Sequence, residues 1–173
     1  MVPLKPISEN AIPSALERAL RYRLLNEPLE SESICRDVLA ADPGNSEALV
    51  TLLLALTDQF ETESMRALDR AKQVLPQLPG GYERAYYEGI INERWAKAQA
   101  AREMPTHIAA GWFQRAMRCY ENAEALCTSD NPDAVLRWNT CARILQRYEV
   151  LEPAASSASC SAEADIVDEA PSA

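Results

Sequence analysis

The sequence predicts an all-α fold, a solenoid of antiparallel helical hairpins, from three observations. Small and apolar residues recur at a regular distance, since Ala19 and Leu53 are 34 residues apart and Pro43 and Pro79 are 36 apart. Within each segment the apolar residues follow the spacing of one helix face. Proline, glycine and asparagine separate the segments. A period of this length is typical of helical repeat proteins, in which each hairpin packs against its neighbours.

The first hairpin is expected to begin at Ser14. Ser14 and Glu17 have the spacing of a capping box, in which each side chain accepts a hydrogen bond from a free amide of the first turn. Residues 26–28 (Asn-Glu-Pro) form the turn, and the second helix follows to Ala41. Residues 42–45 (Asp-Pro-Gly-Asn) end it, because proline disfavours helical geometry in the residue before it.

The second hairpin contains the most apolar helix of the chain. Residues 46–59 include LVTLLLAL, which is apolar almost all round and predicts a central helix covered on both sides. A fourth helix begins at Thr62 or Glu63 and ends at Pro76. Its apolar stripe consists of Met65, Leu68, Ala71, Val74 and Leu75.

The third hairpin is longer than the first two. Two helices are expected at residues 82–103 and 108–127, joined by Met104-Pro105-Thr106. The extra length equals about two helical turns in each helix, which keeps the inner faces of the pair in register. This pair should therefore project beyond the rest of the solenoid. A last helix, from Asn131-Pro132 through Tyr148, should cover its apolar face.

Acidic residues are concentrated after the last helix. The formal net charge is -9, and residues 152–173 contain no Lys or Arg but five acids: Glu152, Glu163, Asp165, Asp168 and Glu169. This segment has too little apolar surface to fold. We expect an N-terminal extension at 1–13, a helical repeat domain at 14–149 and a disordered acidic tail at 150–173. The acidic balance argues against a nucleic-acid partner.

The spacings resemble those of the tetratricopeptide repeat family, in particular its small bacterial members. The resemblance covers residues 12–148 and is carried by Ala19, Tyr22, Ala116, Tyr120, Ala123, Trp138 and Ala142. It implies a right-handed solenoid of about three hairpins, the third elongated, followed by a C-terminal capping helix. It also implies protein binding, because in this family the first helix of each hairpin lines a concave groove that receives a peptide or helix of a partner.

By position, the resemblance assigns nine residues to the peptide-binding groove: Leu16, Leu20, Leu24, Val50, Leu54, Asp58, Tyr86, Ile90 and Arg94. Such a wall is largely apolar and suits an amphipathic or apolar segment of a partner. We expect burial along the leucines, Tyr86 and Ile90 to supply affinity, and Asp58 and Arg94 to fix orientation. Each single leucine is equally compatible with a place in the core.

A possible second surface lies around the tip of the long hairpin, at Trp95, Met104, His107 and Trp112. It could be a contact surface, for example in a homodimer. The alternative is that Trp95 and Trp112 pack on each other across the hairpin, and for this pair we favour that interpretation.

No sequence motif indicates catalysis, a cofactor or a metal site, so we expect a non-enzymatic adaptor. The five cysteines are odd in number and none form a pair with two-residue spacing. Cys35, Cys127 and Cys141 are expected in the core, and Cys119 is assigned no role. The first residues lack a secretory signal and no stretch has membrane-spanning length, which predicts a soluble cytoplasmic protein without membrane insertion.

Two other functions remain open at this stage. The chain could be a structural subunit that self-associates through the long third hairpin. It could also be a secretion-type chaperone, which tetratricopeptide proteins of similar size and acidity resemble, and would then require a hydrophobic client.

Overall fold

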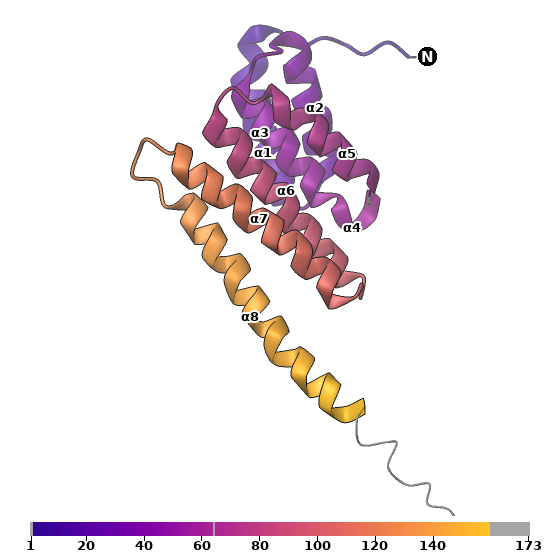
Figure 1. Cartoon of the computed structure of the whole chain (residues 1–173). Coiled ribbons are helices and arrows are strands. Elements are labelled where there is room, and N and C mark those ends of the chain that lie inside the picture. The colour runs from indigo at the N-terminus through magenta and orange to yellow at the C-terminus, as the bar shows by residue number, and fades with distance from the viewer. Residues whose placement is uncertain (1, 64, 160–173) are drawn as a thin grey trace, which may run out of the picture.

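The computed structural model describes residues 2–63 and 65–159, and all regular structure in these ranges is helical (Figure 1). Of the expected tail, residues 160–173 lie outside this description. The first elements are a 3-10 turn η1 (Glu9–Ala11), α1 (Ile12–Leu24), α2 (Pro28–Ala41), α3 (Ser46–Asp58), α4 (Phe60–Glu63), α5 (Met65–Val74) and a second 3-10 turn η2 (Leu75–Gln77). The remaining helices are α6 (Gly81–Ala101), α7 (Thr106–Leu126) and α8 (Asp133–Ser159).

The start of the first helix differs from the prediction. Helix α1 begins at Ile12 after Ala11, and Ser14 lies inside the helix, where its hydroxyl donates to the Ala11 carbonyl at 3.0 Å. Pro13 accounts for the earlier start, because proline is pre-set for the first helical turn and its missing amide is not needed there. The predicted capping box is therefore wrong, and α1 begins two residues before the position expected from it.

The turn after α1 confirms the predicted end of that helix. Asn26 has φ 62°, the left-handed conformation that asparagine tolerates better than most residues. The amide of Glu27 donates to the Tyr22 carbonyl at 2.9 Å, and that of Asn26 donates to Arg23 at 3.1 Å. These two bonds form a Schellman motif, which satisfies the last carbonyls of the helix.

Helix α3 is the central buried element, as its sequence predicted. Asn45 caps it by accepting a hydrogen bond from the Ala48 amide at 2.9 Å. Eight of its residues are buried, and it packs against α2 on one side and α5 on another. It also contacts α1 and α6, so it joins the first half of the chain to the second.

Two hydrophobic clusters fill the interior. The first surrounds α3 and includes Leu53, Phe60 and Trp95. The second lies between α6, α7 and α8 and includes Phe113 and Tyr120. Tyr87 and Trp112 pack against both clusters, which makes the interior continuous.

Helices α6 and α7 are 21 residues long and antiparallel, in agreement with the predicted long pair (Figure 1). Helix α8 runs beside α7 and packs against it, with Ala134 and Cys141 buried. It continues past Tyr148 to Ser159, so the boundary expected at residue 150 does not mark the end of the helix.

The segment before η2 also differs from the prediction. A single helix from Thr62 or Glu63 was expected, but α4 already begins at Phe60. Helix α5 keeps the predicted stripe at Leu68, Ala71 and Val74. Met65 does not belong to this stripe, since it is 56% exposed.

Candidate functional site

Three helices contribute the predicted groove residues to one surface. We call it the α1–α3–α6 face and define it by the following residues: Leu20, Arg23, Leu24, Val50, Leu54, Asp58, Tyr86 and Arg94. Asp58 of α3 accepts hydrogen bonds from Arg23 of α1 and from Arg94 of α6. This shared carboxylate brings Arg23, Asp58 and Arg94 together. Leu20 lies one helical turn from Arg23 on α1, and Leu54 lies one turn from Asp58 on α3.

Of the nine predicted groove residues, two are part of the core. Leu16 packs with Val38 and Ala48, and Ile90 belongs to the cluster between α6, α7 and α8. Their assignment to the groove is wrong, because neighbouring helices cover them. Leu20 and Leu24 are exposed, whereas the other five are partly buried: Val50, Leu54, Asp58, Tyr86 and Arg94.

The charged side chains of the α1–α3–α6 face form ion pairs with one another. Arg23 Nε donates to Asp58 Oδ2 at 2.7 Å, and Arg94 donates to the other carboxylate oxygen and to Thr57 Oγ1, the latter at 2.9 Å. Asp58 and Arg94 were expected to orient a partner, but here they fix α1, α3 and α6 relative to each other. The sequence analysis missed Arg23, although its separation of 35 residues from Asp58 is close to the repeat period.

Exposed leucines extend this face toward the turn between α1 and α2. Leu20 is 45% exposed and Leu24 is 76% exposed. Leu25 and Leu29 follow at the turn and at the start of α2, also exposed. Because fully burying a leucine side chain is worth about 1.5–3 kcal/mol, these residues can contribute substantially to binding.

Tyrosines form the part of the face contributed by α6. The Tyr86 ring lies 5.8 Å from Tyr82 in a stacked arrangement and 5.2 Å from Tyr87 in an edge arrangement, measured between ring centroids. Burial raises the pKa of Tyr87, so its hydroxyl stays neutral at physiological pH. Aromatic side chains with neutral hydroxyls provide large contact area and a hydrogen-bonding group at protein interfaces.

A fully buried carboxylate supports α6 from inside. Glu93 accepts hydrogen bonds from Tyr120 of α7 at 2.7 Å, from Lys97 at 2.5 Å and from Arg137 of α8 at 3.3 Å. Burial raises the pKa of Tyr120, and the charge of Glu93 adds to this effect. The residue connects three helices, and its role is structural because its partners occupy it.

Gly89 makes this arrangement possible. A Cβ atom at Gly89 would lie 2.4 Å from Tyr120 Cε1, closer than carbon atoms approach. The glycine therefore lets the Tyr120 ring pack against α6 and reach Glu93 with its hydroxyl. The sequence analysis assigned no role to Gly89.

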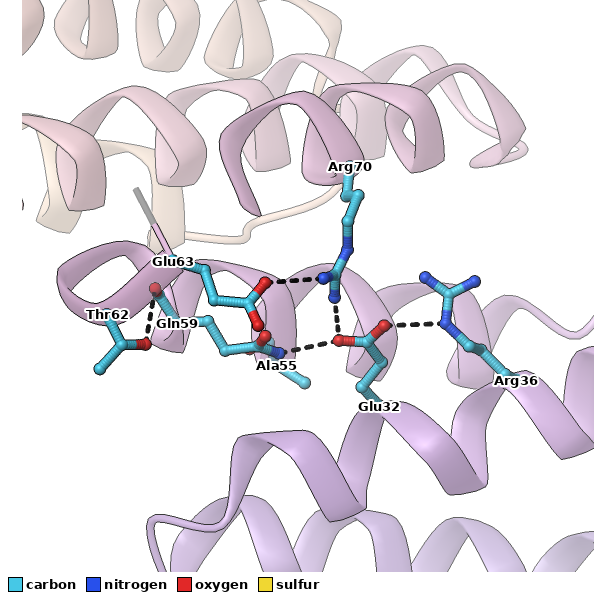
Figure 2. Close-up of polar contacts among 7 residues, drawn as sticks. All are labelled: Glu32, Arg36, Ala55, Gln59, Thr62, Glu63 and Arg70. Carbon is cyan, nitrogen blue, oxygen red and sulfur yellow. Dashed lines mark hydrogen bonds and ion pairs between the residues drawn. The ribbon is translucent and has the colours of Figure 1, made fainter. Parts of the chain in front are cut away.

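A second buried carboxylate, Glu32 of α2, lies in a polar network between α2, α3 and α5 (Figure 2). Arg36 donates to Glu32 Oε1 at 2.8 Å, and Gln59 donates to Oε2 at 2.9 Å. Arg70 reaches from α5 to Glu32 and also donates to Glu63 at 2.8 Å. Both oxygens of Glu32 are engaged, which leaves no free carboxylate for acid–base chemistry.

Burial tends to raise the pKa of Glu32. The hydrogen bonds from Gln59 and Arg36 and the charge of Arg70 outweigh it, so the pKa lies below the ordinary value. The side chain is therefore ionised near neutral pH and binds the two guanidinium groups as a carboxylate.

Not all residues of the predicted second surface are exposed. Trp95 is buried and packs edge-on against Phe60 at 5.5 Å and against Trp112 at 6.4 Å between ring centroids. This confirms the expectation that the two tryptophans pack on each other. Met104 and His107 are exposed at the tip, whereas Trp112 is half-buried.

The cysteines follow the prediction in part. Cys35 and Cys141 are buried, as expected. Cys127 lies just after α7 and is only partly buried, with its thiol donating to the Ser129 carbonyl at 3.1 Å, so its assignment to the core is wrong. Burial raises the pKa of Cys119 to about 11, which keeps this thiol protonated and unreactive.

Within residues 2–63 and 65–159, no three His, Cys, Asp or Glu side chains are placed to hold a metal ion. Among the helices that the structure describes, none combines the length and apolar character needed to span a membrane. Comparisons with protein-family models, curated proteins and solved structures found no match to this chain. The geometry of the α1–α3–α6 face is thus the basis on which a function can be proposed.

Proposed function

We propose that the chain is a non-enzymatic cytoplasmic adaptor of tetratricopeptide type, a right-handed solenoid whose α1–α3–α6 face binds an amphipathic or apolar segment of a partner protein. One observation carries this proposal. Leu20 and Leu24 of α1 are exposed, and the shared carboxylate of Asp58 joins α1 to α3 and α6, which carry the partly exposed Leu54 and Tyr86. Spaced apolar anchors of this kind suit the apolar stripe of a partner helix or peptide.

The polar groups of the face support the same conclusion. Arg23 and Arg94 share Asp58, with side chains that are about a fifth exposed. Two guanidinium groups on one carboxylate leave little free charge to repel an apolar segment. Tyrosine and arginine are both enriched in protein interfaces, and this face carries both residue types.

The proposal includes that the chain is not an enzyme. The two buried carboxylates are held by guanidinium, amide, ammonium and phenol donors, and each donor comes from the protein itself. Groups that act as general acids or bases instead face a substrate within hydrogen-bond reach.

Photo-cross-linking tests the proposal in cells. A benzoylphenylalanine at position 24 should form a cross-link to a partner protein. The same group at position 136, where Leu136 of α8 is 58% exposed, serves as the control. Equal cross-linking from both positions would contradict a specific face. A product that contains only a second copy of the chain would favour self-association instead.

A further inference from the structure

The surface between α5, α6 and α7 contains a cavity of about 390 Å³, which we call the α5–α7 cavity. Helix α5 contributes Lys72, α6 contributes Glu88 and Asn92, and α7 contributes Trp112, Arg115 and Arg118. None of these residues belongs to the α1–α3–α6 face. Ligand pockets commonly have volumes of about 300–1,000 Å³, so this cavity can hold a small molecule or one side chain of a partner.

The three cations of the cavity are positioned without a carboxylate. The guanidinium of Arg115 lies 4.6 Å and the amine of Lys72 lies 5.8 Å from the centroid of the Trp112 ring. Arg118 follows Arg115 by one helical turn on α7 and lines the same cavity. Among the residues that the structure describes, none of these three cations lies within 4.0 Å of a carboxylate oxygen. An indole ring attracts a cation but does not neutralise its charge, so all three charges remain available to an anion.

The net formal charge of the cavity lining is +2. Against its three cations stands one carboxylate among the described residues, that of Glu88. Burial raises the pKa of Cys119, which also lines the cavity, and the charge of Glu88 adds to this effect. In a chain of net charge -9, a local excess of positive charge attracts an anionic ligand.

Amide side chains add hydrogen-bonding groups beside the cations. Asn92 is 7% exposed, and its Nδ2 donates to Cys119 Sγ at 3.5 Å. Sulfur is a weak acceptor, so this buried amide has a poorer partner than an oxygen atom would be. Asn122 lies one turn after Arg118 and is exposed. Both amides can donate to the oxygens of an anion.

We propose that the α5–α7 cavity binds a phosphate monoester, carried by a small molecule or by a phosphorylated side chain of a partner protein. Such a group has a charge of about -1.5 to -2 and three acceptor oxygens, which match the net charge of the lining and its three cations. The guanidinium groups of Arg115 and Arg118 have the fork geometry that pairs with phosphate oxygens, and Lys72 adds a point charge. A single carboxylate has one charge and two oxygens, and would leave part of this lining unpaired.

Titration of the full ¹⁵N-labelled chain with O-phosphoserine, followed by NMR of the indole N–H groups, tests this proposal. The chain has three tryptophans, and of these Trp112 lines the cavity. Its signal should shift at about pH 7.5, where the phosphate is mostly dianionic because its second pKa is about 6. The signal of Trp138, whose indole donates to Glu121, should stay in place. Unphosphorylated serine should shift neither signal.

Variants of the lining test whether its charge is responsible. Arg115→Gln together with Arg118→Gln should weaken the Kd for O-phosphoserine at least tenfold, or about 1.4 kcal/mol. Glu88→Gln should tighten the Kd at least about twofold because it removes a like charge, a gain that damage to the fold would not produce. The matched control is Arg143→Gln together with Arg147→Gln, two exposed positions of α8, which should leave the Kd unchanged. Thermal unfolding of each variant verifies that the fold is retained.

Two further ligands identify the source and the chemistry of the anion. Tighter binding of a glycine–serine peptide with one phosphoserine than of O-phosphoserine would assign the site to a phosphorylated partner; otherwise it belongs to a small ester. Malonate, a dicarboxylate of the same charge, should bind at least about fivefold more weakly because it lacks the phosphate geometry. Equal affinity for malonate, no shift of the Trp112 signal, or an unchanged Kd in either cavity variant would overturn the proposal. These outcomes do not depend on any partner of the α1–α3–α6 face.

Discussion

The α1–α3–α6 face and the cavity between α5, α6 and α7 use arginine in opposite ways. This α5–α7 cavity is lined by Lys72, Glu88, Asn92, Trp112, Arg115, Arg118, Cys119 and Asn122. On the face, Arg23 and Arg94 are bound to Asp58, and leucines and tyrosines remain available for contact. In the cavity, Lys72, Arg115 and Arg118 have no carboxylate partner at salt-bridge distance among the residues that the structure describes. The position of the carboxylates therefore decides which surface suits an apolar segment and which an acidic one.

The largest expected effect on stability concerns the contact between Gly89 of α6 and Tyr120 of α7. Helix α6 contributes to the face, and both helices contribute to the cavity. Gly89→Ala would place a methyl group against the Tyr120 ring and separate Tyr120 from Glu93. We expect the free energy of unfolding to fall by about 2–3 kcal/mol, the usual cost of overpacking a core. Urea denaturation measures this change.

Gly111 of α7 provides the matched control, because a Cβ atom there meets nothing within 4 Å. Gly111→Ala should raise the free energy of unfolding by about 0.5–1 kcal/mol through higher helix propensity. Loss of stability in both variants would show that the effect at Gly89 is not specific to Tyr120.

The next largest effect comes from a substitution that gives the α1–α3–α6 face an excess of positive charge like that of the cavity. Asp58→Ala leaves Arg23 and Arg94 without their shared carboxylate. We expect the free energy of unfolding to fall by about 2 kcal/mol, as for hydrogen bonds to charged groups. The face should then also bind an acidic peptide such as residues 160–173, which fluorescence anisotropy of the labelled peptide can measure. No gain in peptide binding would contradict the role assigned to Asp58.

A smaller effect follows from the ionisation of Glu32. Its pKa in the folded chain lies below the ordinary value of 4.5, so its ionised form stabilises the fold above that pH. This contribution is lost as the pH falls from 4.5 through the lower folded pKa, where Arg36 loses its carboxylate partner and Arg70 keeps only Glu63. Glu32→Gln should lower the free energy of unfolding by about 1 kcal/mol at pH 7. It should also make the free energy of unfolding fall less steeply between pH 5 and pH 3. An unchanged slope would contradict the assignment.

The smallest effect on stability is expected in the cavity itself. Arg115→Gln removes an exposed cation that touches Trp112 and, in the described part of the chain, has no carboxylate partner. The free energy of unfolding should change by less than about 0.5 kcal/mol, as for most surface positions. A larger loss, measured by urea denaturation, would mean that Arg115 has a structural role and would weaken the contrast between the two surfaces.

The helix ends were largely predictable because they depend on local chemistry. Asn26 and residues 42–45 end helices by their own backbone preferences, and the structure shows these turns. Pro13 was the local signal that predicted the start of α1 better than Ser14 did. The long α6–α7 pair followed from counting residues between equivalent positions.

The contents of the site were less predictable because they depend on contacts between distant helices. Periodicity places Ile90 and Leu54 on equivalent faces of their helices, but it does not show that α7 and α8 cover Ile90. Glu93 and Tyr120 are 27 residues apart, and only the packing of α6 on α7 brings them together. Charge pairing across the repeat, as between Arg23 and Asp58, was the one signal in the sequence that could have been used.

The most direct test of the account is the affinity of the α1–α3–α6 face for the partner captured at position 24. Leu20 of α1 and Leu126 at the end of α7 are similarly exposed, at 45% and 47%. The account predicts that Leu20→Lys weakens the Kd at least tenfold, or about 1.4 kcal/mol. It also predicts that Leu126→Lys leaves the Kd unchanged and that both variants unfold like the unmodified chain. An equal Kd for the two variants would contradict the proposed binding face.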